Sequence, residues 1–123
     1  MAKRILVVDD EPLVVKLLAT RLEASNYEVI SAYDGREGLE KARDEKPDLV
    51  IVDLRLPGIN GYEICSQLKN DDAFAGIPVI VITGSTDKKD RELAEDASAD
   101  AYIIKPFDRE VLLSKIEELL GEK

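Results

Sequence analysis

The sequence predicts an α/β fold in which a parallel β-sheet carries helices on both of its faces. The first observation is a set of three short, continuous and mostly β-branched apolar runs at residues 5–8, 49–52 and 79–82. Such runs are typical of strands buried on both faces of a parallel sheet. The second observation is that helical patterns lie between these runs, so that strands and helices alternate along the chain. Together they predict an open sheet with right-handed crossovers.

Two weaker strand candidates, at residues 29–30 and 102–104, complete five strand–helix units. The first helix is expected to begin at Pro12, because proline suits the first turn of a helix. Asp108 is the expected N-cap of the last helix. The residues expected to face the core at helical spacing are Val14, Leu17, Leu18 and Leu22, then Leu39 and Ala42, then Ile64, Cys65 and Leu68, then Leu93, Ala94 and Ala97, and last Leu112, Ile116 and Leu119.

Length, charge and cysteine content narrow the class of protein. With 123 residues, of which 45% are hydrophobic, the chain is predicted to form a single domain over residues 1–123. Its net charge of −9, without a basic cluster, argues against direct binding of nucleic acid. Cys65 is the single cysteine, which excludes an internal disulfide. The apolar run at residues 5–8 is too short for a signal peptide or a membrane span, which predicts a cytoplasmic protein without membrane attachment.

Polar residues of particular kinds follow four of the predicted strands. Asp9 and Asp10 follow the first strand, Asp53 the third, Thr83 the fourth and Lys105 the fifth. The carboxyl ends of parallel strands lie along one edge of the sheet, where ligands bind in open α/β folds. We therefore expect three carboxylates, one hydroxyl and one ammonium to share a pocket.

The charges of this predicted pocket indicate its chemistry. Three clustered carboxylates repel one another and cannot all stay ionised without compensation. Lys105 offsets one charge, and a divalent cation would offset more; an all-oxygen ligand set with few protein contacts suits Mg²⁺. A carboxylate that keeps one oxygen free can act as a nucleophile toward phosphorus. Metal, ammonium and hydroxyl would then bind the phosphoryl oxygens in the transition state.

Four segments, at residues 7–11, 53–61, 81–84 and 101–107, together resemble the receiver domains of two-component response regulators. The resemblance covers essentially the whole chain, and every signature position is filled. It implies a flavodoxin-like (βα)5 three-layer sandwich with the parallel strand order 2-1-3-4-5. Two positions depart from the family: Leu56 stands where Met is frequent, and Ser98 stands where Gly is frequent before the fifth strand.

The resemblance implies a phosphoacceptor and a set of metal ligands. Asp53 is the expected phosphoacceptor. Asp10, Asp53 and the backbone carbonyl of Arg55 are expected to bind Mg²⁺ directly, whereas Asp9 is expected to act through a metal-bound water. Arg55 and Ser85 occupy positions that vary in the family and tune the lifetime of the phosphoryl group, in a direction that the residues do not reveal.

The resemblance also implies a switch. Lys105 is expected to pair with the Asp53 carboxylate before transfer and with the phosphoryl group after it. Thr83 is expected to move toward the phosphoryl group and let Tyr102 turn inward. A cis peptide between Lys105 and Pro106 is expected to direct the lysine into the site. The fourth helix, with the fifth strand and the fifth helix, is the expected signalling face.

The function implied is that of a signalling protein and not of an enzyme with an external substrate. A histidine kinase or a histidine phosphotransfer protein is the expected donor, and a downstream effector protein or output domain is the expected receiver of the signal. Weak Mg²⁺-dependent self-phosphorylation and self-dephosphorylation are expected. Leu13 and Val15 lie outside the predicted core stripe of the first helix, and a further hypothesis is that they help to dock the donor.

Other interpretations of the same residues remain open at this stage. An aspartate-nucleophile phosphatase needs a second Asp two residues after the nucleophile, where this chain has Arg55. A flavin- or nucleotide-binding module needs a Gly-rich or Ser/Thr-rich phosphate loop after the first strand. Asp9 and Asp10 are also interpretable as helix caps, and Tyr102 as a core aromatic residue. The charged residues 87–92 are interpreted as a solvated helix start.

Overall fold

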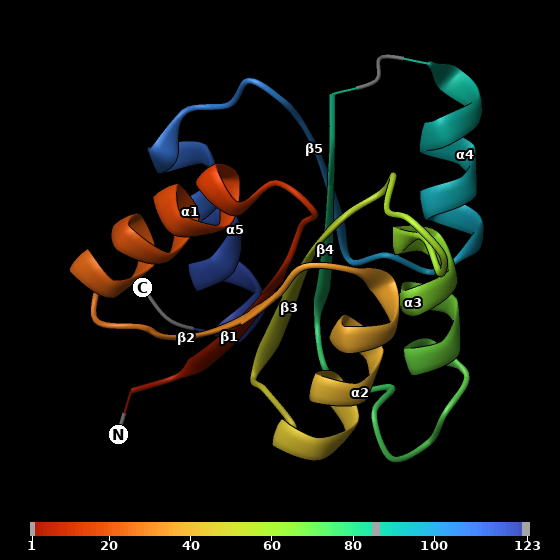
Figure 1. Cartoon of the computed structure of the whole chain (residues 1–123), viewed down its shortest axis with the longest axis horizontal. Helices are drawn as coiled ribbons and strands as arrows, with labels where there is room; N and C mark the ends of the chain where they lie inside the picture. The colour runs from red at the N-terminus through yellow and green to blue at the C-terminus, as the bar shows by residue number, and fades with distance from the viewer. Residues whose placement is uncertain (1, 85–86, 122–123) are drawn as a thin grey trace.

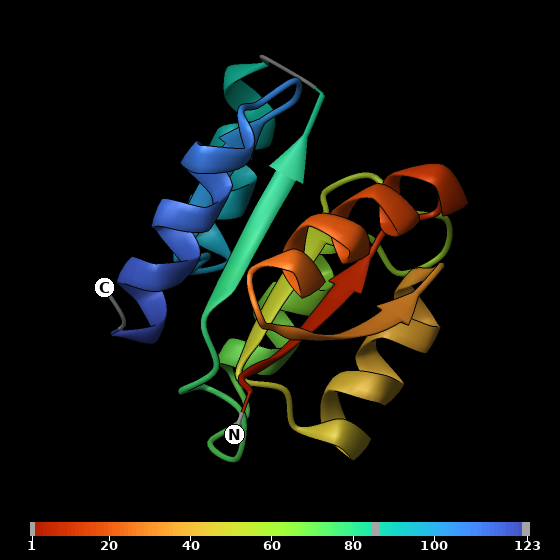
Figure 2. The same ribbon diagram turned by 90° about the vertical axis from the view of Figure 1, so that its left-hand side faces the viewer.

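The computed structural model describes residues 2–84 and 87–121. Its centre is a five-stranded parallel sheet in the order β2-β1-β3-β4-β5, which confirms the predicted fold class and strand order. Figure 2 shows the strands running in the same direction. The strands are β1 Arg4–Val8, β2 Glu28–Ala32, β3 Leu49–Asp53, β4 Val79–Thr83 and β5 Ala101–Ile104.

Five helices cover the two faces of the sheet and make the molecule three layers thick. One face carries α1 and α5, and the other carries α2, α3 and α4 (Figure 1). The helices are α1 Pro12–Ala24, α2 Gly35–Glu45, α3 Gly61–Lys69, α4 Lys88–Asp96 and α5 Arg109–Leu120. Among the described residues, no helix has the length and apolar composition needed to cross a membrane.

The two central strands that follow β1 in the sheet order are buried along their whole length. All residues of β3 and β4 are buried, as expected for strands with helices on both faces. The register pairs Val8 of β1 with Val52 of β3, and Asp53 of β3 with Ile82 of β4. The ends of these three strands therefore meet at one edge, which positions the polar residues that follow them.

The start of α3 lies directly against the end of β3. Asn60 is the N-cap of α3, and its side-chain oxygen accepts a hydrogen bond from the Glu63 backbone N–H at 3.1 Å. The Gly61 N–H donates to the Leu54 carbonyl at 2.9 Å, and a Cβ atom on Gly61 would collide with the Asp53 backbone oxygen. Because Gly61 has no side chain, the first turn of α3 can pack directly against the backbone of Asp53.

The predicted core stripe of α1 is confirmed at Leu18 and Leu22, and Val14 is partly buried against the core, but the prediction is wrong at Leu17. The buried residues of α1 are Val15, Leu18 and Leu22, whereas Leu17 is 51% exposed and Leu13 is 81% exposed. The apolar cluster on this helix fits more than one stripe at helical spacing, and packing against the sheet decides between them. Since Val15 lies in the core, it cannot contribute to a docking surface, and that hypothesis is wrong for Val15.

Three local expectations have clear outcomes. The Lys105–Pro106 peptide is cis, as predicted. Asp108 is the N-cap of α5, although its side chain makes no capping hydrogen bond. Ser98 has φ 66°, the left-handed conformation that favours glycine, which explains why glycine is suited to this position.

Candidate functional site

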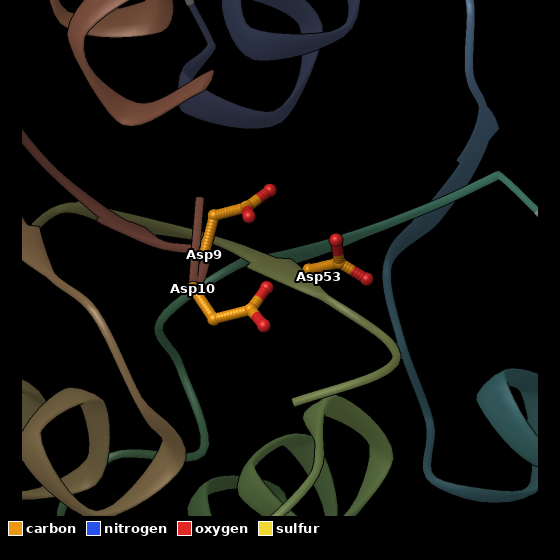
Figure 3. A group of neighbouring side chains, drawn as sticks. All are labelled: Asp9, Asp10 and Asp53. Atoms are coloured by element: carbon orange, nitrogen blue, oxygen red, sulfur yellow. The ribbon is translucent and has the colours of Figure 1, made fainter. Parts of the chain in front are cut away.

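Three aspartates come together at the carboxyl edge of the sheet. Asp9 and Asp10 follow β1, Asp53 ends β3, and the three side chains lie side by side (Figure 3). One carboxylate oxygen from each lies within 4.8 Å of the others. Asp9 and Asp53 are buried, at 1% and 8% exposure, whereas Asp10 is exposed. The cluster is therefore closed on the protein side and open to solvent through Asp10.

Lys105 connects two of the three carboxylates. Its Nζ donates to Asp53 Oδ2 at 2.8 Å and to Asp9 Oδ2 at 3.1 Å. The Lys105 backbone N–H donates to the Thr83 carbonyl at 2.7 Å. This hydrogen bond connects the start of the loop between β5 and α5 to the end of β4. The ammonium group thus bridges two acids that stand 44 residues apart in the chain.

The other oxygen of each bridged acid accepts a backbone hydrogen bond. The Glu11 N–H donates to Asp9 Oδ1 at 3.0 Å, and the Arg55 N–H donates to Asp53 Oδ1 at 2.9 Å. The N-cap of α1 is Glu11, which makes no side-chain capping hydrogen bond. The helix-capping interpretation of Asp9 and Asp10 is therefore wrong. These local bonds fix the Asp9 and Asp53 carboxylates toward Lys105.

The cluster carries more negative than positive charge. Burial raises the pKa of the Asp9 carboxyl, although hydrogen bonds from the Glu11 N–H and from Lys105 oppose this shift. Burial would lower the pKa of the Lys105 ammonium, but its interactions with Asp53 and Asp9 outweigh burial and raise it. Three carboxylates face one ammonium, which leaves a site of oxygen ligands suited to a hard divalent cation.

An open cleft of about 460 Å³ gives access to this cluster. Thr83, at the end of β4, is buried and lines the cleft. The structure thus brings together the predicted site residues apart from Tyr102; Asp9 belongs to the cluster but does not line the cleft. The lining residues are Asp10, Glu11, Asp53, Arg55, Thr83, Gly84 and Lys105.

Tyr102 lies on β5, outside the acidic cleft. Its ring packs against the core on the α3–α4 side of the sheet, which agrees with the core-aromatic interpretation. Its hydroxyl is also buried, and among the described residues this oxygen finds no hydrogen-bond partner. Burial raises the pKa of the Tyr102 hydroxyl, and the Asp90 carboxylate raises it further. The ring therefore already points inward in this structure.

Asp90 is a residue of interest that sequence reasoning missed. The charged segment at residues 87–92 was expected to be solvated, but Asp90 is 8% exposed, so the expectation was wrong at this position. Arg55 Nη2 donates to Asp90 Oδ2 at 2.6 Å, and this hydrogen bond is the main cause that raises the pKa of Arg55. The available signal was helical spacing, because Asp90 precedes the core residues Ala94 and Ala97 by four and seven positions. Ser85, the second predicted tuning residue, lies outside the described residues.

Similarity to known proteins identifies the family. The chain matches the response regulator receiver domain family over residues 5–117. It is 44% identical to the response regulator ArlR of Staphylococcus saprophyticus over 117 residues, which are 95% of this chain and 52% of ArlR. The chain thus spans about half the length of the curated relatives it matches.

Solved structures agree with this assignment. A CheY-like response regulator receiver domain protein from Methanospirillum hungatei matches with a TM-score of 0.92 and 35% identity, over 98% of this chain and 95% of that chain. The receiver domain of the sensor histidine kinase PA1611 from Pseudomonas aeruginosa, which holds a magnesium ion in its active-site cleft, matches with a TM-score of 0.91 and 26% identity over 99% of this chain and 100% of that chain. The chain therefore belongs to the response regulator receiver domain family.

Proposed function

We propose that residues 1–123 act as one phosphoacceptor receiver domain, in which Asp53 takes a phosphoryl group from a phosphohistidine donor in a Mg²⁺-dependent reaction. The observation that carries this proposal is the position of Asp53. Its buried carboxylate ends the central strand β3, contacts Lys105 at 2.8 Å, and shares an open cleft with Asp10 and Thr83. The family assignment favours this function over the phosphatase and flavodoxin-like alternatives.

The proposed metal ligands are Asp10, Asp53 and the backbone carbonyl of Arg55, with Asp9 acting through a water. The excess negative charge of the cluster and its purely oxygen ligands fit Mg²⁺. The related PA1611 receiver domain holds a magnesium ion in its active-site cleft, which supports Mg²⁺ as the metal. When bound, Mg²⁺ neutralises negative charge on the carboxylates and on the phosphoryl oxygens. Asp9 remains important without direct contact, because it holds Lys105 at 3.1 Å.

The proposed reaction uses an Asp53 oxygen as the nucleophile. The oxygen forms a bond to phosphorus while the P–N bond of phosphohistidine breaks, and the donor imidazole leaves with the electron pair. Lys105 leaves its pairing with the carboxylate and binds a phosphoryl oxygen. Thr83, buried at the end of β4, donates its hydroxyl hydrogen to another phosphoryl oxygen. The phosphorylated side chain carries a charge of about −1.5 to −2 in place of the single negative charge of the carboxylate, and this change then biases the α4–β5–α5 face.

The proposed partners follow from this reaction. A histidine kinase or a histidine phosphotransfer protein donates the phosphoryl group, and an effector protein or an output domain reads the α4–β5–α5 face. The proposed location is the cytoplasm, without membrane attachment or direct contact with nucleic acid, in keeping with the net charge of −9. The built-in catalysis is limited to weak self-phosphorylation from small donors and self-dephosphorylation.

Intact mass measurement after incubation with Mg²⁺ and acetyl phosphate tests the proposal. Wild type is expected to gain one phosphoryl group, and Asp53→Asn is expected to gain none. Asp44→Asn removes an exposed carboxylate from α2 and serves as the matched control, with labelling equal to wild type. Labelling that persists in Asp53→Asn would place the acceptor elsewhere, and labelling of wild type in EDTA would remove the role of the metal.

A further inference from the structure

The side chain of Arg55 is bound to helix α4, whereas its backbone belongs to the acidic cluster. The guanidinium Nη2 donates to Asp90 Oδ2 at 2.6 Å, and Asp90 lies in the first turn of α4. The Arg55 backbone N–H donates to the Asp53 carboxylate at 2.9 Å. The backbone carbonyl of the same residue is also one of the proposed metal ligands. Arg55 thus has its backbone at the candidate metal site and its cation on the neighbouring helix.

The two partners of this ion pair differ in their freedom to move. The Asp90 side chain is 12% exposed, so packing fixes its position on α4. The Arg55 side chain is 69% exposed and can rotate without leaving solvent. Arg55 lines both the acidic cleft and a second cleft of about 490 Å³ that contains Asp90. A guanidinium released from Asp90 therefore has the acidic cleft within reach.

The acidic cluster attracts a released guanidinium. Its three carboxylates face the single ammonium of Lys105, and the exposed Asp10 lines the open cleft. A guanidinium binds carboxylate oxygens through a planar fork of donors and is more weakly hydrated than an ammonium. A free Arg55 side chain would therefore bind oxygens that Mg²⁺ needs. The metal and the side chain would compete for the same negative charge.

The pair with Asp90 opposes this competition. The Arg55–Asp90 hydrogen bond joins two charged groups, and the low exposure of Asp90 limits the screening by water and salt. Rotation of Arg55 into the cleft would also leave a largely buried carboxylate with one donor fewer, which is unfavourable. Both effects hold the guanidinium on α4 and leave the oxygens of the cluster available to a cation.

We propose that Asp90 is a positioning residue for the metal site: it binds the Arg55 guanidinium on α4 and keeps it from competing with Mg²⁺ for Asp10 and Asp53. This role rests on the proposed Mg²⁺ site. Asp90 acts through Arg55 and not through contact with the metal. A movement of the first turn of α4 that separates the pair would weaken Mg²⁺ binding, so the position of α4 and the affinity for the metal are coupled.

Mg²⁺ titrations of the whole chain, followed through backbone amide signals of the cleft by NMR, test this role in a double-mutant cycle. Asp90→Ala is expected to weaken Mg²⁺ binding by about 3–10-fold, because the released guanidinium competes with the metal. Arg55→Gln is expected to bind Mg²⁺ at least as tightly as wild type. In the Arg55→Gln background no guanidinium is left to compete, so Asp90→Ala is expected to change the dissociation constant by less than about 2-fold.

The cycle separates this role from a structural one. Asp90 also interacts with groups other than Arg55, and the loss of those interactions would weaken Mg²⁺ binding equally with and without Arg55. Glu92→Gln removes a 57% exposed carboxylate whose ion-pair partner on α4 is Lys88, and this matched control should bind Mg²⁺ as wild type does. If thermal unfolding shows that Asp90→Ala is not folded, Asp90→Asn replaces it in the cycle, with a loss in the same direction.

The outcomes distinguish the role of Asp90 from the proposed function. A dissociation constant of the Asp90 variant equal to that of wild type overturns the role of Asp90. A loss of equal size in the presence and in the absence of Arg55 overturns it as well. Absence of Mg²⁺ binding in wild type itself overturns the proposed metal site and the Mg²⁺ dependence of the proposed function instead.

Discussion

Two lysines of this chain pair with aspartates at opposite edges of the same sheet. At the carboxyl edge, Lys105 Nζ lies 2.8 Å from Asp53 Oδ2. At the amino edge, Lys69 Nζ lies 2.7 Å from Asp100 Oδ2. Both lysine side chains are largely buried, with exposures of 23% and 13%. Residue types, distances and the burial of the lysines are alike in the two pairs, although the Asp100 side chain is more exposed than that of Asp53, at 32% against 11%. The presence of a short ion pair with a buried lysine therefore does not separate a functional site from a structural one.

The Lys69 pair is balanced in charge and in hydrogen bonds. Its ammonium also donates to the carbonyls of Ala75 and Ile77, at 3.3 and 2.9 Å. Asp100 Oδ2 also accepts the Val79 backbone N–H at 2.7 Å. One cation meets one anion, and the remaining contacts tie the loop after α3 to the starts of β4 and β5. The Lys69 pair is therefore a structural connection.

The Lys105 pair differs because its charges do not balance. Asp9 and Asp10 join Asp53 around a single ammonium, and an open cleft reaches the group. Buried charge in excess destabilises a fold unless a ligand compensates it. The comparison teaches that an uncompensated charge, and not the presence of a buried ion pair, distinguishes the candidate cation site.

The largest expected effect is the loss of phosphoryl transfer in Lys105→Met. If Lys105 binds the transferring group as proposed, removal of its ammonium should slow phosphorylation by acetyl phosphate by about 10²–10³-fold. In EDTA the variant should also unfold more easily, because three carboxylates then lack their cation, and Mg²⁺ should restore most of this loss. Phosphorylation kinetics by intact mass, and thermal unfolding with Mg²⁺ or EDTA, measure both effects. A variant that transfers at the wild-type rate would remove Lys105 from the reaction.

Lys69→Met is the matched change at the amino edge. It leaves the partly exposed Asp100 carboxylate without its cation and removes the donor of two carbonyls, which should lower the free energy of unfolding by about 2–3 kcal/mol. Because no excess charge is present there, Mg²⁺ should not rescue the variant. Urea unfolding with Mg²⁺ and with EDTA measures the loss. A Mg²⁺-dependent recovery equal to that of Lys105→Met would contradict the distinction between the two edges.

Cys65 makes the stability near the amino edge depend on pH, because its thiol interacts with both Lys69 and Asp100. Burial raises the pKa of its thiol from 9.0 to about 11, while Lys69 opposes and Asp100 adds to this shift. The folded state thus holds the proton more tightly, so the contribution of Cys65 to stability is present below pH 9 and is lost as the pH rises toward 11.

A comparison of wild type with Cys65→Ala separates the contribution of this thiol from that of the other titrating groups. The difference in their free energies of unfolding should fall by about 2–3 kcal/mol over this pH range, since each pKa unit corresponds to about 1.4 kcal/mol. Urea unfolding at a series of pH values gives the difference. A constant difference from pH 8 to pH 11 would show that water reaches the thiol.

The sequence predicted the carboxyl edge far better than the amino edge. Asp9, Asp53, Thr83 and Lys105 were found because each follows an apolar run, and the ends of parallel strands meet by topology. No such rule brings Lys69 to Asp100, since that pairing depends on how the loop after α3 closes onto the start of β5.

Two further features depend on packing that the sequence does not specify. The α1 stripe was ambiguous because neighbouring apolar residues fit more than one helical face, and only contact with the sheet selected Val15 over Leu17. The burial of Asp90 was not predicted because its neighbours in the sequence are charged. Its ion-pair partner Arg55 is 35 residues away, so the sequence around Asp90 gives no sign of the pair. Pairings of this kind are set by side-chain reach across a loop and a helix, for which local patterns carry no signal.

The smallest expected effect comes from a substitution at Ser98, near the amino edge of the sheet. It tests whether a change in stability at this edge alters the reactivity of the acidic cluster at the other edge. Ser98 precedes Asp100 by two residues and has φ 66°, where a Cβ atom is unfavourable by about 1 kcal/mol. Ser98→Gly removes this strain but increases the entropy of the unfolded chain, so a net gain of about 0.5 kcal/mol is expected. Ser98→Ala, which keeps the Cβ atom, is the matched control and should show no gain. Because the turn is connected to β5 through the balanced Lys69 pair, the rate of phosphorylation of Asp53 should equal that of wild type in both variants; a changed rate would show that the two edges are coupled through β5.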